Sequence, residues 1–248
     1  MKVLLTLFMG FVIIQAQKID IYSRPFQADP DFNIDVLHYD INLKIYDHKK
    51  SFTATTSVEF QVLKPYLDGI ELKAETFRVT SIFDGAQQLD FTHKNGSIWI
   101  EPIEQPRIGD ELKYTINYQS DGNTADPSKY GMGGVKVLGL GFFDETDDNP
   151  ALVQTHSFPE GARHWFPSND HPADKATSKI TTTVRSDWKV LSNGILTYSK
   201  TNWKKLPNGM NIKSAGSGDS TTYTWELNQP NSTYLYVMVA GPYKIIKD

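Results

Sequence analysis

The chain has 248 residues, of which 39% are hydrophobic and 12% aromatic, and its formal net charge is −4. It contains no cysteine, which excludes a disulfide framework and every zinc site built from thiolates. The weakly acidic balance argues against a nucleic-acid-binding surface, which needs clustered basic side chains, and the aromatic content is too high for a disordered chain.

The N-terminus has the pattern of a secretory signal peptide. Lys2 supplies a short positive segment, and the apolar run at residues 3–14 is shorter than the roughly 20 residues that span a bilayer. Ala16 is a small residue that suits a cleavage site. We therefore expect residues 1–16 to be removed as a signal peptide, and the mature protein to be secreted or periplasmic with no membrane span. Residues 17–34 are predicted to be a polar lead-in.

Two long segments follow in which polar and apolar residues alternate. Residues 35–46 and 51–63 have the period of two that marks a half-buried strand, and the turn between them predicts an antiparallel hairpin. Asp84-Gly85 and Asn95-Gly96 are hairpin turn signals. Shorter strands, rich in β-branched and aromatic residues, are predicted at residues 69–73, 77–83, 88–92, 97–101 and 111–119.

The second half of the chain continues the strand pattern. We predict a hairpin around Asn193-Gly194, and a nearly apolar, buried strand near the end of the chain. A single helical turn is expected at residues 126–130. The predicted strands lie at residues 177–185, 188–191, 194–198, 210–214, 221–227 and 233–240. With no long helical period, the sequence predicts an all-β chain.

Between these two blocks lies a polar and aromatic stretch, residues 154–175. Its prolines at positions 159, 167 and 172 interrupt both a helix and a strand ladder, so we predict a loop. Such a loop on a β scaffold either carries function or forms a packed structural crossover, and the residue types leave both open. Arg163 can pair internally with Asp170 or Asp174 and so pin the loop, or it can receive a substrate carboxylate.

Catalytic and metal-binding motifs are not evident. None of the six histidines begins a His-Glu-x-x-His sequence, and Gly-x-Ser-x-Gly does not occur. His156, His164 and His171, with Asp170 and Asp174, are metal-ligating residue types. Their histidine spacings of eight and seven match no helical or hairpin ligand pair, so hydrogen bonding within the loop is the favoured interpretation and no metal site is predicted.

Several motifs together resemble the N-terminal domain of the M1-family zinc aminopeptidases, the group of aminopeptidase N and leukotriene A4 hydrolase. The main motif is ARHWFPSNDHPADKAT at residues 162–177. The others, in the family's order, are HYDINL at 38–43, WKVLSNG at 188–194, TWELNQP at 224–230 and VAGPY at 239–243. The resemblance implies an all-β, saddle-shaped antiparallel β-sandwich over residues 35–248.

The resemblance also implies a function. In the family this domain covers a zinc catalytic domain that removes N-terminal residues from peptides, and the zinc ligands lie in that catalytic domain. The chain is therefore expected to be non-catalytic and inactive alone, a truncated or stand-alone form without a cofactor of its own. Its implied partners are an M1 catalytic domain and peptide N-termini, with no nucleic acid. The alternatives are a secreted peptide- or glycan-binding β module and an unrelated β-fold hydrolase.

The resemblance finally divides the loop into a frame and a leading end. Family members place an acidic or amide residue five positions before the motif's arginine, where it binds the substrate amine. Here Phe158 lies five positions before Arg163, so either the register slips or the amine-binding group is lost. The implied substrate contacts are Gln154, His156, Phe158 and Glu160. The implied structural frame consists of Arg163, Trp165, Phe166, Pro167, Asp170, Pro172 and Lys175.

Overall fold

The computed structural model describes residues 32–65, 67–120, 125, 137–202, 219–244 and 246. Within these ranges the regular elements are β-strands and short 3-10 turns, which confirms the all-β prediction. The predicted signal peptide, most of the lead-in, the helical turn at 126–130 and the strand at 210–214 lie outside the described residues. No helix in the described part of the chain is long and apolar enough to cross a membrane.

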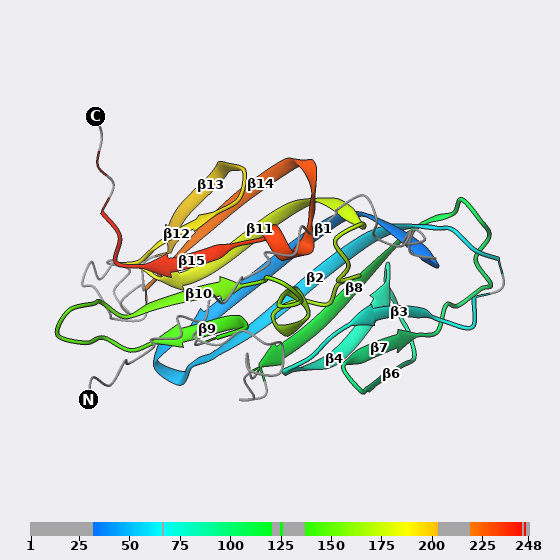
Figure 1. Cartoon of the computed structure of the whole chain (residues 1–248), viewed down its shortest axis with the longest axis horizontal. Helices are drawn as coiled ribbons and strands as arrows, with labels where there is room; N and C mark the ends of the chain where they lie inside the picture. Colours follow the sequence, from blue (N-terminus) through cyan, green and yellow to red (C-terminus); the bar gives the residue numbers. More distant parts are fainter. Residues whose placement is uncertain are drawn as a thin grey trace, which may run out of the picture. The chain divides into compact units, whose positions relative to one another are not determined.

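The largest sheet has eight strands in the order β13-β14-β11-β1-β2-β8-β4-β5 (Figure 1). The predicted central hairpin is confirmed, because β1 (Ile34–Tyr46) and β2 (Ser51–Val62) run antiparallel and close where Tyr46 faces Ser51. A 3-10 turn at Asp47–Lys49 joins them. The other strands are β4 (Phe77–Asp84), β5 (Gln87–Gln88), β8 (Glu111–Ser120), β11 (Lys175–Arg185), β13 (Ile195–Asn202) and β14 (Ser220–Ser232).

The predicted β-sandwich is confirmed, but one pair in this sheet is parallel. β1 and β11 pair in parallel, from His38 opposite Thr177 to Lys44 opposite Thr183. A period of two identifies a strand but does not specify the direction of its partner. The chain between β1 and β11 also passes through the smaller sheets before it returns, so its local pattern does not fix the direction of the returning strand. The large sheet is therefore mixed.

Two smaller sheets complete the fold. In the three-stranded sheet, with order β3-β7-β6, β6 (Phe91–Lys94) and β7 (Ser97–Ile100) form the hairpin predicted at Asn95-Gly96. Both turn residues have positive φ, 53° and 74°, as a tight hairpin turn requires. The remaining strands are β3 (Ile70–Lys73) here, and β12 (Lys189–Ser192), β15 (Met238–Gly241), β10 (Leu152–His156) and β9 (Gly139–Phe143), in that order, in the four-stranded sheet.

The hairpin predicted around Asn193 does not form. β12 pairs with β15 and β13 pairs with β14, so the chain passes from one sheet to another at Gly194. The Asn193 side chain favours this route: its Nδ2 donates to the Leu235 carbonyl at 3.1 Å, and its Oδ1 accepts from the Val237 amide at 2.7 Å. The strand predicted at 233–240 is also interrupted, since the 3-10 turn Thr233–Leu235 precedes β15.

One hydrophobic core connects all three sheets. Ile41 and Val58 from the large sheet, Ile98 from the three-stranded sheet, and Val153 and Met238 from the four-stranded sheet belong to one buried cluster, each at most 1% exposed. A cluster of this extent supplies the stability of a chain without disulfides. The chain between β10 and β11 runs among these sheets.

Candidate functional site

The stretch at residues 154–175 connects β10 to β11 and contains strand at both ends. The prediction of a loop throughout is wrong there, because β10 continues to His156 and β11 begins at Lys175. The first proline of the stretch is Pro159, so the residues before it keep the backbone donors that a ladder needs. Between the strands, the chain forms a 3-10 turn at Ala162–His164 and otherwise follows an irregular path.

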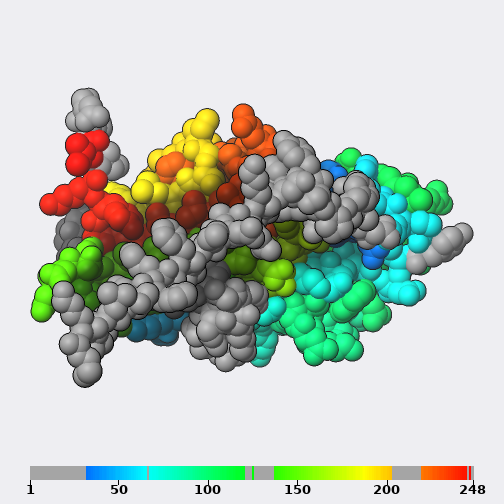
Figure 2. Space-filling model, in the orientation of Figure 1, coloured from blue at the N-terminus to red at the C-terminus, as the bar shows by residue number. Residues whose placement is uncertain are grey.

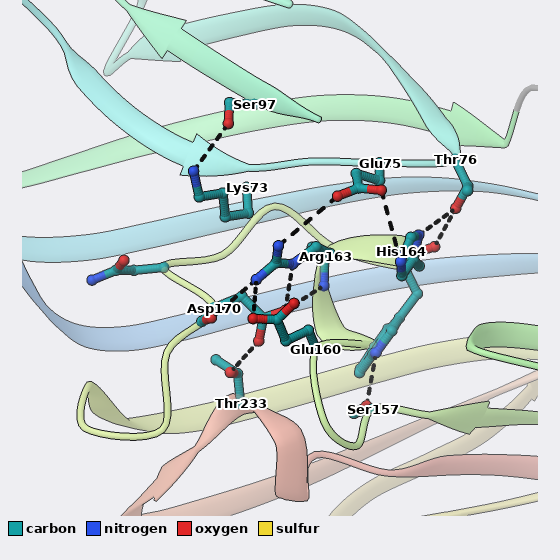
Figure 3. Close-up of polar contacts among 12 residues, drawn as sticks. Lys73, Glu75, Thr76, Ser97, Ser157, Glu160, Arg163, His164, Asp170 and Thr233 are labelled. Atoms are coloured by element: carbon teal, nitrogen blue, oxygen red, sulfur yellow. Dashed lines mark hydrogen bonds and ion pairs between the residues drawn. The ribbon is translucent and has the colours of Figure 1, made fainter. Parts of the chain in front are cut away.

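Arg163 is the charged centre of the loop (Figure 3), and only 13% of its side chain is exposed. Its Nε donates to Asp170 Oδ2 at 3.0 Å, and its Nη2 donates to the Asp170 carbonyl oxygen at 3.3 Å. The other carboxylate oxygen, Oδ1, accepts from Thr233 Oγ1 at 2.7 Å. Burial lowers the pKa of Arg163, but the hydrogen bond and charge of Asp170 outweigh burial and raise it. The guanidinium is thus a fixed internal cation paired with Asp170.

Two further carboxylates lie at the rim of this pair. Glu160 is 3.5 Å from Arg163 Nη2, and Glu75 is 3.9 Å from Nη1. Their side chains are 49% and 32% exposed, so water screens both interactions. Exposed pairs of this kind contribute about 0–1 kcal/mol each. Asp170 therefore provides most of the ionic attachment of the loop.

The aromatic residues of the loop form part of the core. Trp165 and Phe166 are fully buried, and the Trp165 indole donates to Ser157 Oγ at 3.1 Å. Ser157 Oγ in turn donates to the Tyr236 carbonyl at 2.7 Å, so the buried indole N–H and the buried Ser157 hydroxyl both have partners. Phe166 lies parallel to the Tyr236 ring at 5.9 Å and meets Tyr39 edge-on at 5.2 Å. These contacts join the loop to the large sheet.

Backbone hydrogen bonds tie the loop to the three-stranded sheet. Lys73 and Ser168 exchange two of them, at 2.8 and 3.0 Å, and the Glu75 amide donates to the Arg163 carbonyl at 2.7 Å. The next residue, Thr76, has a φ of 51°, which is uncommon for a β-branched side chain. The corner after β3 is therefore held in a strained conformation against the loop.

His164 is buried beneath this corner. Thr76 Oγ1 donates to the His164 carbonyl at 3.1 Å, and Gly139 passes so close that a side chain there would collide with His164. Burial, followed by the neighbouring Arg163 charge, lowers the pKa of His164 to about 4. The imidazole is therefore neutral at neutral pH, and its 3.9 Å approach to Glu75 is not an ion pair under those conditions.

The four predicted substrate contacts occupy the leading end of the loop. Gln154 and His156 are half-buried on β10, and their spacing of two residues places both on one side of the strand. His156 Nε2 is buried and has no hydrogen-bond partner among the described residues. Phe158 is 56% exposed and touches Tyr234 edge-on at 6.0 Å, whereas Glu160 turns toward Arg163. Their contact with substrate stays a prediction.

The remaining frame residues differ in their surroundings. Pro167 is buried together with its aromatic neighbours, whereas Pro172 and Lys175 are exposed. The Pro172 carbonyl accepts from Ser232 Oγ at 2.6 Å, which holds the end of the loop against β14. Sequence reasoning missed the partners that complete the frame, because most of them lie far away in the chain and carry no local signal. These partners are Glu75, Thr76, Ser157, Thr233 and Tyr236.

The metal-ligating side chains of the loop do not converge. The His171 ring packs edge-on against Phe32 at 5.1 Å, and Asp174 accepts from the Val36 amide at 3.2 Å and from the Asn169 side chain. Within the described ranges, no group of three or more His, Cys, Asp or Glu side chains is placed to hold a metal ion. The described side chains therefore do not fit a zinc site.

Comparison with known proteins agrees with this architecture. The family model "Peptidase M1 N-terminal domain" matches residues 36–235. Aminopeptidase Q of Mus musculus is 42% identical over 60 residues, which are 24% of this chain and 11% of that protein.

Solved structures show the same fold. The M1 zinc metallopeptidase of Deinococcus radiodurans matches with a TM-score of 0.66 and 21% identity, over 84% of this chain and 42% of that one. Native yeast LTA4 hydrolase matches with a TM-score of 0.63 and 19% identity, over 90% of this chain and 32% of that one. The chain thus spans less than half the length of these relatives. Because the family match covers most of the sequence, the chain belongs to the peptidase M1 N-terminal domain family.

Proposed function

We propose that this chain is the non-catalytic N-terminal domain of a secreted M1-type aminopeptidase, where it forms a wall of the substrate site of a zinc-containing catalytic domain. The observation that carries this proposal is the division of the loop. The charged centre, Arg163, is paired within the frame, and the neighbouring aromatic rings are buried. Phe158, at the leading end, is exposed. The frame is thus suited to hold that end in a fixed position.

An exposed apolar surface supports a partner domain beside the leading end. The apolar patch consists of Leu191, Ile195, Leu235 and Val237, which are 37–70% exposed. They lie on connected segments: the Asn193 side chain bonds the backbone on both sides of Tyr236, and Phe158 contacts Tyr234. Grouped apolar side chains on a surface mark interaction sites. We propose that the apolar patch packs against the catalytic domain.

The leading end of the loop would also contact the substrate. A phenyl ring cannot accept a hydrogen bond from an ammonium group, and the nearby Glu160 carboxylate faces Arg163. We propose that Phe158 contributes an apolar contact to the first side chain of a peptide, and that the amine is held mainly by the catalytic domain. Gln154 and His156, half-buried on β10, would line the same wall.

A two-part experiment tests this proposal. The purified chain, with zinc added, is expected to release no product from amino-acyl chromogenic substrates, and turnover that a chelator abolishes would contradict the non-catalytic role. The chain should bind an M1 catalytic domain from the same organism, and Leu235→Asp should weaken that binding by about tenfold or more. Ile103→Asp, at an equally exposed apolar residue outside the apolar patch, is the matched control.

The remaining assignments are tested separately. Calorimetric heat with free-amino-terminus peptides in the absence of a catalytic domain would favour the alternative of an independent peptide-binding module. N-terminal sequencing of the exported protein tests the proposed cleavage near Ala16, and an intact Met1 would refute it.

A further inference from the structure

A tryptophan stands exposed on the three-stranded sheet, away from the loop. Trp99 is in the middle of β7, opposite Glu71 on β3 and Thr92 on β6. Its neighbours along the strand, Ile98 and Ile100, are fully buried, whereas Trp99 itself is 41% exposed. The core therefore takes the other side of β7, and the indole lies on the outer face. The strands of this sheet reach the molecular surface in Figure 2.

The indole borders a shallow pocket of about 350 Å³ that is also lined by polar side chains. Asp68, Thr92, Lys94 and Glu101 line it, and within the described ranges their side chains make no hydrogen bond or ion pair. This differs from the adjacent group on the same face, where Lys73 Nζ and Ser97 Oγ both donate to Glu71. The pocket thus combines an apolar ring with donors and acceptors that are free to meet a ligand.

Gly69 keeps one edge of the ring open. A Cβ at this position would lie 3.6 Å from Trp99 Cε3 and 3.2 Å from the Ile100 carbonyl oxygen. Any longer side chain at position 69 would therefore extend over the indole or displace the strand. The glycine leaves the pocket wall flat beside the ring.

We propose that this pocket binds a neutral pyranose sugar, stacked on Trp99. A pyranose has one face of C–H groups, which packs on an aromatic ring, and a rim of hydroxyls that both donate and accept hydrogen bonds. The carboxylates of Asp68 and Glu101 accept from such hydroxyls, and Lys94 donates to them. With two carboxylates against one ammonium, the lining carries a formal net charge of −1, which disfavours anionic sugars. The volume is at the lower end for ligand pockets, which suits one sugar ring.

This site is independent of the proposed aminopeptidase role, because none of its lining residues belongs to residues 154–175. The test is a titration of the chain with methyl glycosides of glucose, galactose, mannose, N-acetylglucosamine and N-acetylgalactosamine, observed through the indole N–H signals by NMR. We expect the Trp99 signal, assigned by its loss in Trp99→Ala, to shift saturably in the millimolar range with at least one glycoside. Absence of any saturable shift with the whole panel would overturn the proposal.

Two variants separate recognition from folding. Asp68→Asn/Glu101→Gln keeps the ring and is expected to weaken binding by about tenfold. Tyr198→Ala, which removes another exposed aromatic ring, is the matched control and should leave binding unchanged. Unaltered binding in the carboxylate variant, or equal loss in the control, would refute a site at Trp99. Unchanged indole signals of the buried tryptophans would show that each variant is folded.

Discussion

Replacement of Arg163 by alanine is expected to destabilise the fold strongly, because it removes the cation from a buried pair. The Asp170 side chain is only 2% exposed. In the variant its carboxylate would keep the Thr233 hydroxyl and the backbone amide of residue 163 as donors, but no opposite charge within bonding distance. Breaking a buried pair on one side costs about 3–5 kcal/mol, and the two surviving bonds lower our estimate to about 2–4 kcal/mol.

The assay is thermal and urea unfolding followed by circular dichroism. A loss of about 2–4 kcal/mol corresponds to a fall in Tm of roughly 5–15 °C for a chain of this size. Arg185→Ala is the matched control, since Arg185 is 39% exposed and its partners Asp187 and Asp47 are 32% and 24% exposed. It should cost less than about 1 kcal/mol. Adding Asp170→Asn to Arg163→Ala should restore part of the loss. An unchanged Tm in Arg163→Ala would refute the structural role of this arginine.

Three further predictions concern burial and backbone geometry. Burial, and then Asp35, raises the pKa of Asp174 to about 7, so the contribution of Asp174 to stability is lost as pH rises from about 4 to 7. Burial lowers the pKa of His164 to about 4, so the contribution of His164 to stability is lost as pH falls from about 6.5 to 4. Unfolding free energies in Asp174→Asn should therefore rise more steeply with pH over this interval than in the wild type, and a parallel profile would contradict the assignment. Ser157→Ala leaves the Trp165 indole N–H unsatisfied and should cost about 1–3 kcal/mol by urea titration, whereas a loss within error would mean that another acceptor takes over. Gly194 has a φ of 89° and faces the Glu226 carbonyl, so Gly194→Ala should lower Tm far more than Gly85→Ala, whose added Cβ meets no atom within 4 Å; equal shifts would count against this steric argument.

Local signals predicted local structure well. The Asn95-Gly96 turn needs only two residues of positive φ, and Asn and Gly are the residue types that favour this conformation. The pair of Arg163 and Asp170 spans seven residues, so it could be anticipated from the loop alone. In each case the interacting groups are close in the chain, and residue chemistry restricts the possible arrangements.

Tertiary structure decided the features that sequence could not predict. The parallel pairing of β1 with β11 joins residues about 139 apart, and nothing in either strand's alternation favours that direction. The hairpin expected at Asn193 does not form, because the Asn193 side chain makes hydrogen bonds with the backbone of Leu235 and Val237 instead. The positive φ of Thr76 runs against its own preference, so it could not be inferred from the residue type.

The same contrast bears on which residues of the proposed substrate wall can be replaced without loss of stability. The frame is fixed by distant partners, such as Ser157 with Tyr236 and Lys73 with Ser168, so substitution there costs stability. Phe158 is exposed, and among the described residues its ring contacts one other ring, that of Tyr234. Substitution of Phe158 should therefore cost little stability. A residue that can be substituted with little loss of stability, and whose backbone is held in a fixed position, is suited to changes in substrate specificity. On the proposed function, Phe158→Gln or Phe158→Glu in a complex with an M1 catalytic domain should alter substrate preference without lowering Tm, because the frame that positions the residue is untouched.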